Sequence, residues 1–252
     1  ILQSFHYHGA DENILYESHP HIGTDKLPGI IKNMRETIQN AGGQIIFNTK
    51  VSDIIIEDNT VKAIKINENE RLDVKRLILA TGHSARDIYE LLDRKDIAIK
   101  AKPFAVGVRV EHPQNQIDRI QYHGKLSDEL LPAASYNVAV QVENRGVYSF
   151  CMCPGGYIVP SATVEKTIVV NGMSPAKRNS PFANAGIVVE IKPSDLEEYA
   201  QFGELAGLKF QEKLESMAYL NSGNGQVAPA QQLADFVKGK LSATLPPSSY
   251  LP

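Results

Sequence analysis

Apolar positions early in the chain recur with the period of a helix. Over residues 27–41 they lie three and four positions apart, which predicts an amphipathic helix with a stripe formed by Ile30, Ile31, Met34, Ile38 and Ala41. Thr24 and Asp25 suit the start of this helix, and Pro28 suits its first turn. Gly42 and Gly43 then end it.

Residues 44–82 have the period of strands instead. The run QIIFNT (44–49) predicts a strand, and the alternation over 51–57 and 61–67 predicts an antiparallel hairpin, with a third short strand at 71–74. The continuous apolar run LILA (77–80) predicts a strand buried on both faces. Thr81 and Gly82 form a turn into a helix over 84–94. This order indicates an α/β unit with a β-meander inserted before its last strand.

The pattern changes near residue 102, where we place a domain boundary between residues 1–102 and 103–252. The second part is predicted to be a mixed α+β domain, with short apolar strands separated by Pro, Gly and Asn turns. The predicted strands are 105–110, 135–143, 146–153, 167–173 and 185–192, and the predicted helices are 194–220 and 228–239.

Composition narrows the class of protein. The 252 residues carry a net charge of −3, so there is no basic excess to neutralise the phosphates of a nucleic acid. No apolar run approaches the roughly 20 residues that a spanning helix needs. We therefore expect a soluble, cytoplasmic protein that acts on a small-molecule substrate, with no nucleic-acid or membrane partner.

Four of the seven histidines, His6, His8, His19 and His21, lie within sixteen residues and are followed by Asp25. Two H-x-H pairs and a carboxylate are chemically able to bind a metal, which would suit a metal-dependent hydrolase. However, Pro20 interrupts the second pair, and no later cluster supplies further ligands. Surface histidines and a ligand-facing role are the two other interpretations.

The two cysteines are Cys151 and Cys153, in the run CMCPGG. On a regular strand, positions i and i+2 share a face at roughly 6.5–7 Å, the far edge of disulfide geometry. We therefore predict two reduced thiols, buried on a strand, with redox activity as the alternative. The glycines that follow permit close backbone approach to a ligand.

The only G-x-G-x-x-G/A match, residues 223–228, follows a predicted helix and runs into Pro229, so it is a loop and not a dinucleotide fingerprint. In their order along the chain, HPHIGTDKL, LATGHSARD, KPFAVGVRVEHPQ, GVYSFCMCPGG, NGMS and APAQ resemble bacterial FAD-dependent oxidoreductases of the FAD/NAD-utilising dehydrogenase type. The likeness extends from about His19 to Phe236. It implies a glutathione-reductase-like FAD-binding unit interrupted by a substrate domain, with FAD as cofactor and NAD(P) as a second one.

The resemblance also assigns roles to particular residues. It implies that the backbone of Val51 contacts the adenine side of FAD and that residues 80–82, namely Ala80, Thr81 and Gly82, pass close to the dinucleotide. The segments HPHIGTDKL, CMCPGG and APAQ would lie towards the flavin ring or the substrate. His21, His83 and Cys153 are then the candidate catalytic residues, as proton donors or substrate contacts, and no metal is expected.

Members of this family carry a G-x-G-x-x-G near the start of the FAD domain and a glycine-rich final strand, and this sequence has neither. We therefore expect an internal fragment with a partial FAD-binding unit and a truncated substrate domain, inactive alone and not retaining FAD. The alternatives are a non-catalytic ligand-binding protein with the flavoprotein fold and, less favoured, the metal-dependent hydrolase.

Overall fold

The computed structural model describes residues 1–67, 70–124, 131–223 and 225–250. The chain divides into two compact units: Ile1–Asn33 joined with Ala101–Pro252, and Met34–Lys100 between them. We call them the larger and the smaller unit. The boundary at 33/34 falls inside helix α2 (Leu27–Asn40). The predicted division into a cofactor domain, 1–102, and a substrate domain, 103–252, stays a prediction, because compactness alone does not show which part binds what.

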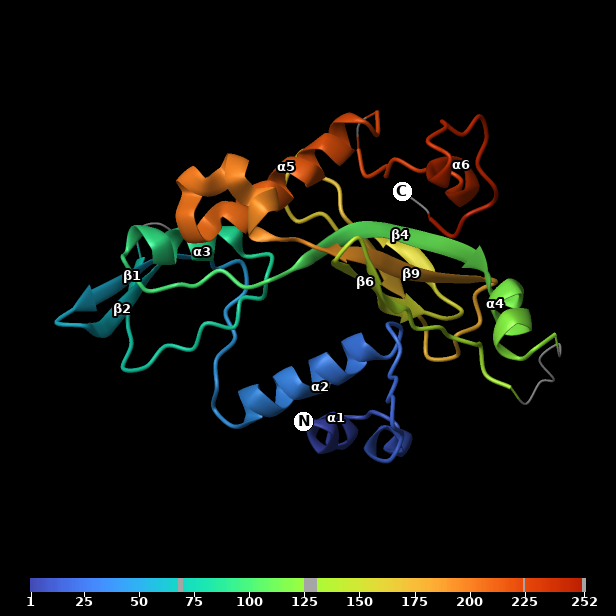
Figure 1. Ribbon diagram of the computed structural model, residues 1–252. Coiled ribbons are helices and arrows are strands. Elements are labelled where there is room, and N and C mark those ends of the chain that lie inside the picture. Colours follow the sequence, from blue (N-terminus) through green and yellow to red (C-terminus); the bar gives the residue numbers. More distant parts are fainter. Residues whose placement is uncertain (68–69, 125–130, 224, 251–252) are drawn as a thin grey trace. The chain divides into compact units, whose positions relative to one another are not determined.

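The smaller unit is built on a three-stranded antiparallel sheet in the order β1 (Val51–Glu57), β2 (Thr60–Ile66) and β3 (Glu70–Asp73) (Figure 1). Asp58 and Asn59 both have positive φ, 50° and 56°, as two-residue hairpin turns require. Helix α3 (Arg86–Arg94) follows. One buried cluster joins this helix to the sheet: Ile54, Ile64, Ile66, Ile88 and Leu91. The predicted hairpin, third strand and helix are confirmed.

Two other predicted strands of this unit are wrong. Residues 44–49 and 77–80 have no strand geometry, and the apolar side chains expected to be buried are exposed, Phe47 at 63% and Ile78 at 89%. A strand forms only where a neighbour takes up its backbone hydrogen bonds. Among the described residues of the smaller unit, the only paired strands are those of the meander.

The larger unit contains a four-stranded antiparallel sheet and a two-stranded one (Figure 1). The first has the order β4 (Ala105–Pro113), β9 (Phe182–Glu190), β6 (Arg145–Cys153), β5 (Ala139–Val142). The second pairs β7 (Tyr157–Pro160) with β8 (Val170–Met173). The predicted strands over 135–143 and 167–173 shrink to β5 and β8. The mixed class of α and β elements is confirmed, with all described strand pairs antiparallel.

The helices of the larger unit are α1 (Leu2–Tyr7), η1 (Glu12–Leu15), α4 (Gln114–Gln121), η2 (Pro193–Leu205), α5 (Ala206–Leu220) and α6 (Leu233–Val237). The two helices predicted over 194–220 and 228–239 are broken or shorter in the structure, and α1, η1 and α4 were not predicted. The single helix expected over 194–220 is wrong, because Gly203 adopts φ 53° and ψ −126° and interrupts it. The helix over 228–239 shrinks to α6. Within the described part of the chain, no helix combines the length and apolar composition that crossing a membrane requires.

Strand β9 sets the register of the large sheet. It pairs with β4 over nine consecutive positions, from Ala105 opposite Glu190 to Pro113 opposite Phe182, without a shift. Its pairing with β6 is interrupted between Phe150 and Cys153. This irregularity places residues 151 and 152 in a bulge at the end of β6.

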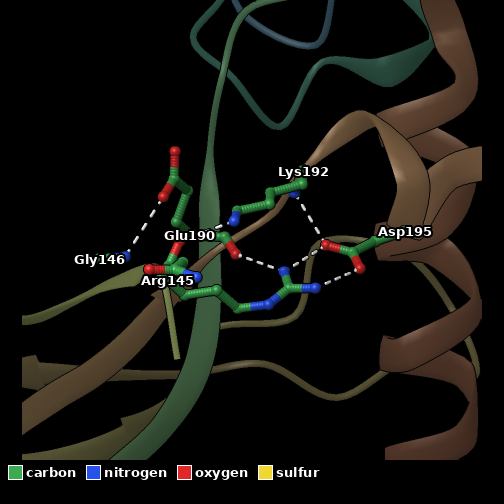
Figure 2. A network of polar contacts seen from close by, with 6 residues as sticks. Arg145, Gly146, Glu190, Lys192 and Asp195 are labelled. Carbon is green, nitrogen blue, oxygen red and sulfur yellow. Dashed lines mark hydrogen bonds and ion pairs between the residues drawn. The ribbon is translucent and has the colours of Figure 1, made fainter. Parts of the chain in front are cut away.

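An ion-pair network ties the start of β6 to the end of β9 and to η2 (Figure 2). Arg145 donates to both carboxylate oxygens of Asp195, at 2.5 and 2.7 Å, and to the Glu190 carbonyl at 3.1 Å. The Lys192 backbone N–H also donates to Asp195, at 2.8 Å. The bidentate Arg145 hydrogen bond, followed by the one from Lys192, lowers the pKa of Asp195 from 3.8 to about 2.

We predict that Asp195→Asn destabilises the protein at pH 7 and that this deficit shrinks as the pH falls from about 4 to about 2. The folded-state pKa is depressed, so the stabilisation is complete above the unfolded pKa and is lost on acidification through the folded one. Urea unfolding at several pH values measures this difference. Glu198→Gln, an exposed change on η2, is the matched control; an equal deficit at pH 2 and pH 7 for Asp195→Asn would contradict the assignment.

Candidate functional site

A turn built from main-chain contacts carries the two cysteines. We call residues 151–156 the thiol turn; it leads from β6 into β7. The Gly155 N–H donates to the side-chain oxygen of Gln114 at 2.7 Å, and the Gly156 N–H donates to the Phe182 carbonyl at 2.9 Å. Gln114 is itself buried at the start of α4. The turn is therefore held by α4 on one side and by the start of β9 on the other.

Gly155 cannot be replaced without moving the backbone. Its φ is +52°, and an added Cβ would lie 1.7 Å from the carbonyl oxygen of Arg178. The Gly155 carbonyl in turn accepts a hydrogen bond from the Ser180 N–H at 3.2 Å. The turn thus needs glycine for two reasons, the left-handed backbone and the approach of residues 178–180.

The segment that follows β8 joins this turn to the N-terminal part of the larger unit. We call residues 174–178 the docking loop. The buried Ser174 hydroxyl donates to the Pro154 carbonyl at 2.9 Å. The Ser174 carbonyl accepts the Thr24 backbone N–H at 3.0 Å. Ser174 therefore connects residues that are 130 positions apart in the sequence.

Asp25 and His21 make the remaining contacts to the docking loop. The Asp25 carboxylate accepts the Ala176 N–H at 2.7 Å, and this hydrogen bond is the main cause that lowers the pKa of Asp25. The His21 Nε2 lies 3.0 Å from the Pro175 carbonyl oxygen. Because a carbonyl only accepts, His21 Nε2 carries the hydrogen of this bond. Both side chains thus hold the docking loop in place.

His6 and His8 also bond to the backbone. The ring nitrogen Nδ1 lies 2.9 Å from the Ala10 carbonyl in His6 and 2.6 Å from the Ser4 carbonyl in His8. Among residues 1–67, 70–124, 131–223 and 225–250, no three or more His, Cys, Asp or Glu side chains gather as a metal site would need. The metal-dependent hydrolase therefore gains no support from the geometry.

Arg109 lies next to the thiol turn. It projects from β4 and donates from Nη1 to the Asn184 side-chain oxygen at 2.5 Å and to the Cys151 carbonyl at 3.1 Å. Asn184 is fully buried, and its Nδ2 has no hydrogen-bond partner among the residues that the structure describes. Gly172 allows this arrangement, because an added Cβ would lie 2.2 Å from Arg109 Nη1. A positive charge is thus fixed beside the cysteine backbone.

The two cysteines differ in exposure and acidity. Cys151 is exposed, whereas Cys153 is 7% exposed and its thiol points to the Cys151 carbonyl at 3.3 Å. A hydrogen bond from the Cys153 thiol, aided by the Arg109 charge, lowers the pKa of Cys151 to about 5. The same hydrogen bond, together with burial, raises the pKa of Cys153. This arrangement therefore favours the ionised form of Cys151 and the protonated form of Cys153.

The predicted regular-strand geometry of this pair is wrong. Cys151 has φ +48°, and it lies in the bulge where β6 loses its register with β9. The spacing of positions i and i+2 on a flat strand therefore does not apply. The prediction of buried cysteines holds for Cys153 only, while the structure has both as free thiols.

Comparison with known proteins identifies the family. Residues 103–252, which include the thiol turn, the docking loop and Arg109, match the family described as FAD-dependent protein, C-terminal domain-like. The chain belongs to this family of FAD-dependent proteins. An uncharacterized protein of Clostridium beijerinckii is 42% identical over 239 residues, which is 94% of this chain and 44% of that protein. The chain thus spans less than half of that relative's length.

The described residues do not supply the part of an FAD site that binds the pyrophosphate of the cofactor. Dinucleotides are bound where a strand runs through a glycine turn into a helix. Residues 77–80, which precede the turn at Gly82, are not a strand. The glycines at 223 and 225 follow α5 and lead into an irregular segment, not into a helix, and Asn224 lies outside the described residues. The described part of the chain therefore lacks a pyrophosphate-binding loop.

The structure brings together two of the predicted site residues. His21 and Cys153 both contact the network around the docking loop. The other predicted residues lie in the smaller unit. His83 is exposed with Nε2 3.3 Å from the Ser84 hydroxyl. Val51 begins β1 opposite Ile66.

Residues 80–82, which the resemblance places beside the dinucleotide, lie in an irregular and exposed segment. Ala80 and Thr81 have no regular secondary structure, and Gly82 has φ +78° with no atom within 4 Å of an added Cβ. The cofactor contacts of Val51, Ala80, Thr81 and Gly82 stay predictions, since no ligand is present.

Sequence reasoning missed Arg109, Asn184 and the acidity of Cys151. A signal for Arg109 exists in the sequence, because it is the one charged residue in the apolar run AVGVRV (105–110). A charge among strand valines indicates a buried partner. Asn184 carries no comparable signal, since only the β4–β9 register brings it close to Arg109.

We predict that Gly155→Ala lowers the free energy of unfolding by more than about 2 kcal/mol, because the left-handed backbone alone costs about 1–2 kcal/mol and the clash with the Arg178 carbonyl adds to it. Gly239→Ala is the matched control: its φ is +64°, but nothing lies within 4 Å of an added Cβ. Urea unfolding followed by circular dichroism measures both. Equal losses in the two variants would show that the thiol turn is not tightly enclosed.

Proposed function

We propose that this chain is an internal piece of a longer FAD-dependent oxidoreductase that acts on a small-molecule substrate. The observation that carries the proposal is the thiol turn, in a chain that belongs to a family of FAD-dependent proteins. There the acidic thiol of Cys151 lies beside the guanidinium of Arg109, and His21 holds the neighbouring docking loop. A flavin supplies the redox chemistry in such enzymes, while the protein binds and orients the reactants.

The smaller unit supports the proposal that other parts of a longer protein are needed to complete its FAD-binding sheet. Residues 44–49 and 77–80 keep the apolar, β-branched composition of strands but expose it, as with Ile46 at 60% and Ile78 at 89%. Exposed apolar segments of this kind mark surfaces that pair with another part of a protein. We propose that strands elsewhere in the longer protein complete a glutathione-reductase-like sheet here, next to which Val51 and residues 80–82 meet FAD.

The thiol turn forms the substrate side in this proposal. Cys153 and His21 remain the candidate catalytic residues of the larger unit, and His83 that of the smaller unit. NAD(P) as electron donor and a cytoplasmic location belong to the proposal as well. The matching relative is itself uncharacterized, so the substrate is defined only as a small molecule.

We predict that the full-length gene product purifies yellow with stoichiometric FAD, whereas the 252-residue chain, incubated with FAD, emerges from gel filtration without stoichiometric flavin. The reason is that the described residues offer no pyrophosphate-binding loop. Absorbance at flavin wavelengths measures both, and bleaching by NADH or NADPH under argon tests the electron donor.

Two outcomes decide against the proposal. A full-length protein that stays colourless with excess FAD would favour the non-catalytic ligand-binding alternative. A 252-residue chain that holds stoichiometric FAD would place the whole cofactor site within this chain and contradict the proposed division of labour.

A further inference from the structure

We propose that Cys151 and Cys153 form a redox-active dithiol that reduces small-molecule disulfides, with Cys151 as the attacking thiolate and Cys153 as the resolving thiol. This proposal goes beyond the flavin chemistry above and does not depend on it, because it uses only side chains of the thiol turn. It replaces the interpretation of the pair as two inert strand cysteines.

The first argument is the position of Cys151. It is exposed, and its positive φ of 48° at the bulge takes it out of the regular alternation of β6. Non-glycine residues in this conformation are uncommon, and they concentrate where the surrounding structure holds a functional group in place. A disulfide in solution therefore has access to the Cys151 sulfur.

The second argument is the charge around that sulfur. The Arg109 guanidinium is held by Asn184 at 2.5 Å and by the Cys151 carbonyl at 3.1 Å, so it cannot easily turn away. The Cys153 thiol and this guanidinium lower the pKa of Cys151 to about 5. The thiolate is the attacking form of cysteine, and at pH 7 it is the main form of Cys151.

The third argument concerns Cys153. Its pKa is raised by its hydrogen bond to Cys151, by burial and by the negative charge of Cys151. When Cys151 becomes part of a mixed disulfide, that charge disappears and with it two of the three causes. Arg109 and Ser174, which favour the Cys153 thiolate, remain. Reaction at Cys151 therefore activates Cys153.

The reaction balances as two thiol–disulfide exchanges. The Cys151 thiolate attacks one sulfur of a disulfide R–S–S–R, forms an S–S bond to it and releases R–S⁻. Cys153 gives its proton to the released thiolate, and its sulfur then attacks Cys151 Sγ. The Cys151–Cys153 bond forms, the mixed disulfide breaks and a second R–S⁻ leaves. The protein loses two electrons, and the small disulfide gains them as two thiols.

The two cysteines flank a single residue at the bulge where β6 loses its register with β9. A disulfide needs its Cα atoms within about 7 Å and its Cβ vectors directed at each other. The Cys153 Sγ already lies 3.3 Å from the carbonyl oxygen of Cys151. These are the only cysteines of the chain, so no other pair competes.

The test exposes the reduced 252-residue chain to glutathione disulfide and follows its intact mass. We expect an intramolecular disulfide, seen as the loss of two hydrogen atoms, that excess reduced glutathione reverses. Cys153→Ser is expected to stop at a stable glutathione adduct on Cys151, and Cys151→Ser is expected to react at least about tenfold more slowly, because its remaining thiol is buried and protonated.

A second measurement tests the role of Arg109. The alkylation of Cys151 by iodoacetamide, followed by peptide mass spectrometry, is expected to be half-maximal near pH 5. Arg109→Gln is expected to raise that midpoint by at least about one pH unit, because an opposite charge is lost. Arg119→Gln removes the same charge from the exposed end of α4 and is the control, with an unchanged midpoint. Circular dichroism confirms that each variant folds.

Three results would overturn the proposal: wild-type chain that accumulates only a mixed disulfide, Cys151→Ser that reacts as fast as Cys153→Ser, or a Cys151 midpoint at the ordinary thiol value near 9. None of these measurements involves flavin. Any of these three results would therefore leave the FAD proposal unaffected. A full-length protein that stays colourless with FAD would likewise leave the dithiol proposal unaffected.

Discussion

Three main-chain groups on two adjacent glycines determine how the larger unit is assembled. The Gly155 N–H, the Gly155 carbonyl and the Gly156 N–H bond to Gln114, Ser180 and Phe182, which lie in α4, in the segment before β9 and at the start of β9. A side chain at either glycine would disturb this assembly, since an added Cβ would lie 1.7 Å from the Arg178 carbonyl oxygen at Gly155 and 2.5 Å from the Met173 carbonyl oxygen at Gly156. Backbone hydrogen bonds of enclosed groups must be paired, so the loops have little freedom to dock elsewhere.

The acidity of Cys151 follows from the way these hydrogen bonds fix the turn at Gly155 and Gly156. Strand β6 pairs with β9 as far as Phe150 and again at Cys153, with one extra residue on β6 between these pairs. The intervening residues must absorb the mismatch, and Cys151 does so with a left-handed backbone. The bulge turns the Cys151 carbonyl to Arg109 and leaves its thiol exposed. Asn184, buried opposite, keeps the guanidinium in place. An acidic thiol thus results from how a strand ends, and this thiol is the basis of the proposed dithiol.

Local features of this fold were predictable, and long-range ones were not. The hairpin around Asp58 and Asn59 and helix α3 follow from periodicity and turn residues within a few positions. The strands expected at 44–49 and 77–80 are absent from the described structure, although their sequence pattern is typical of strands. A strand also needs a neighbouring strand to pair with, and the period of the sequence does not reveal whether one is present. At the site, the motifs indicated that residues near His21 and Cys153 belong together. Their link through Ser174 depends on loop contacts over long sequence distances. The contact between Arg109 and Asn184, 75 positions apart, depends on the register of β4 and β9.

Amide hydrogen exchange measured residue by residue tests the central claim, that the thiol turn is a closed backbone junction. At neutral pH we expect the amides of Gly155 and Gly156 to exchange as slowly as those in the middle of β9. Asp25→Ala should speed exchange at Ala176, whose amide it binds, and leave the two glycines protected. Exchange at Gly155 and Gly156 as fast as in an unprotected loop would contradict the account, because the junction that shapes the cysteine site would then be open.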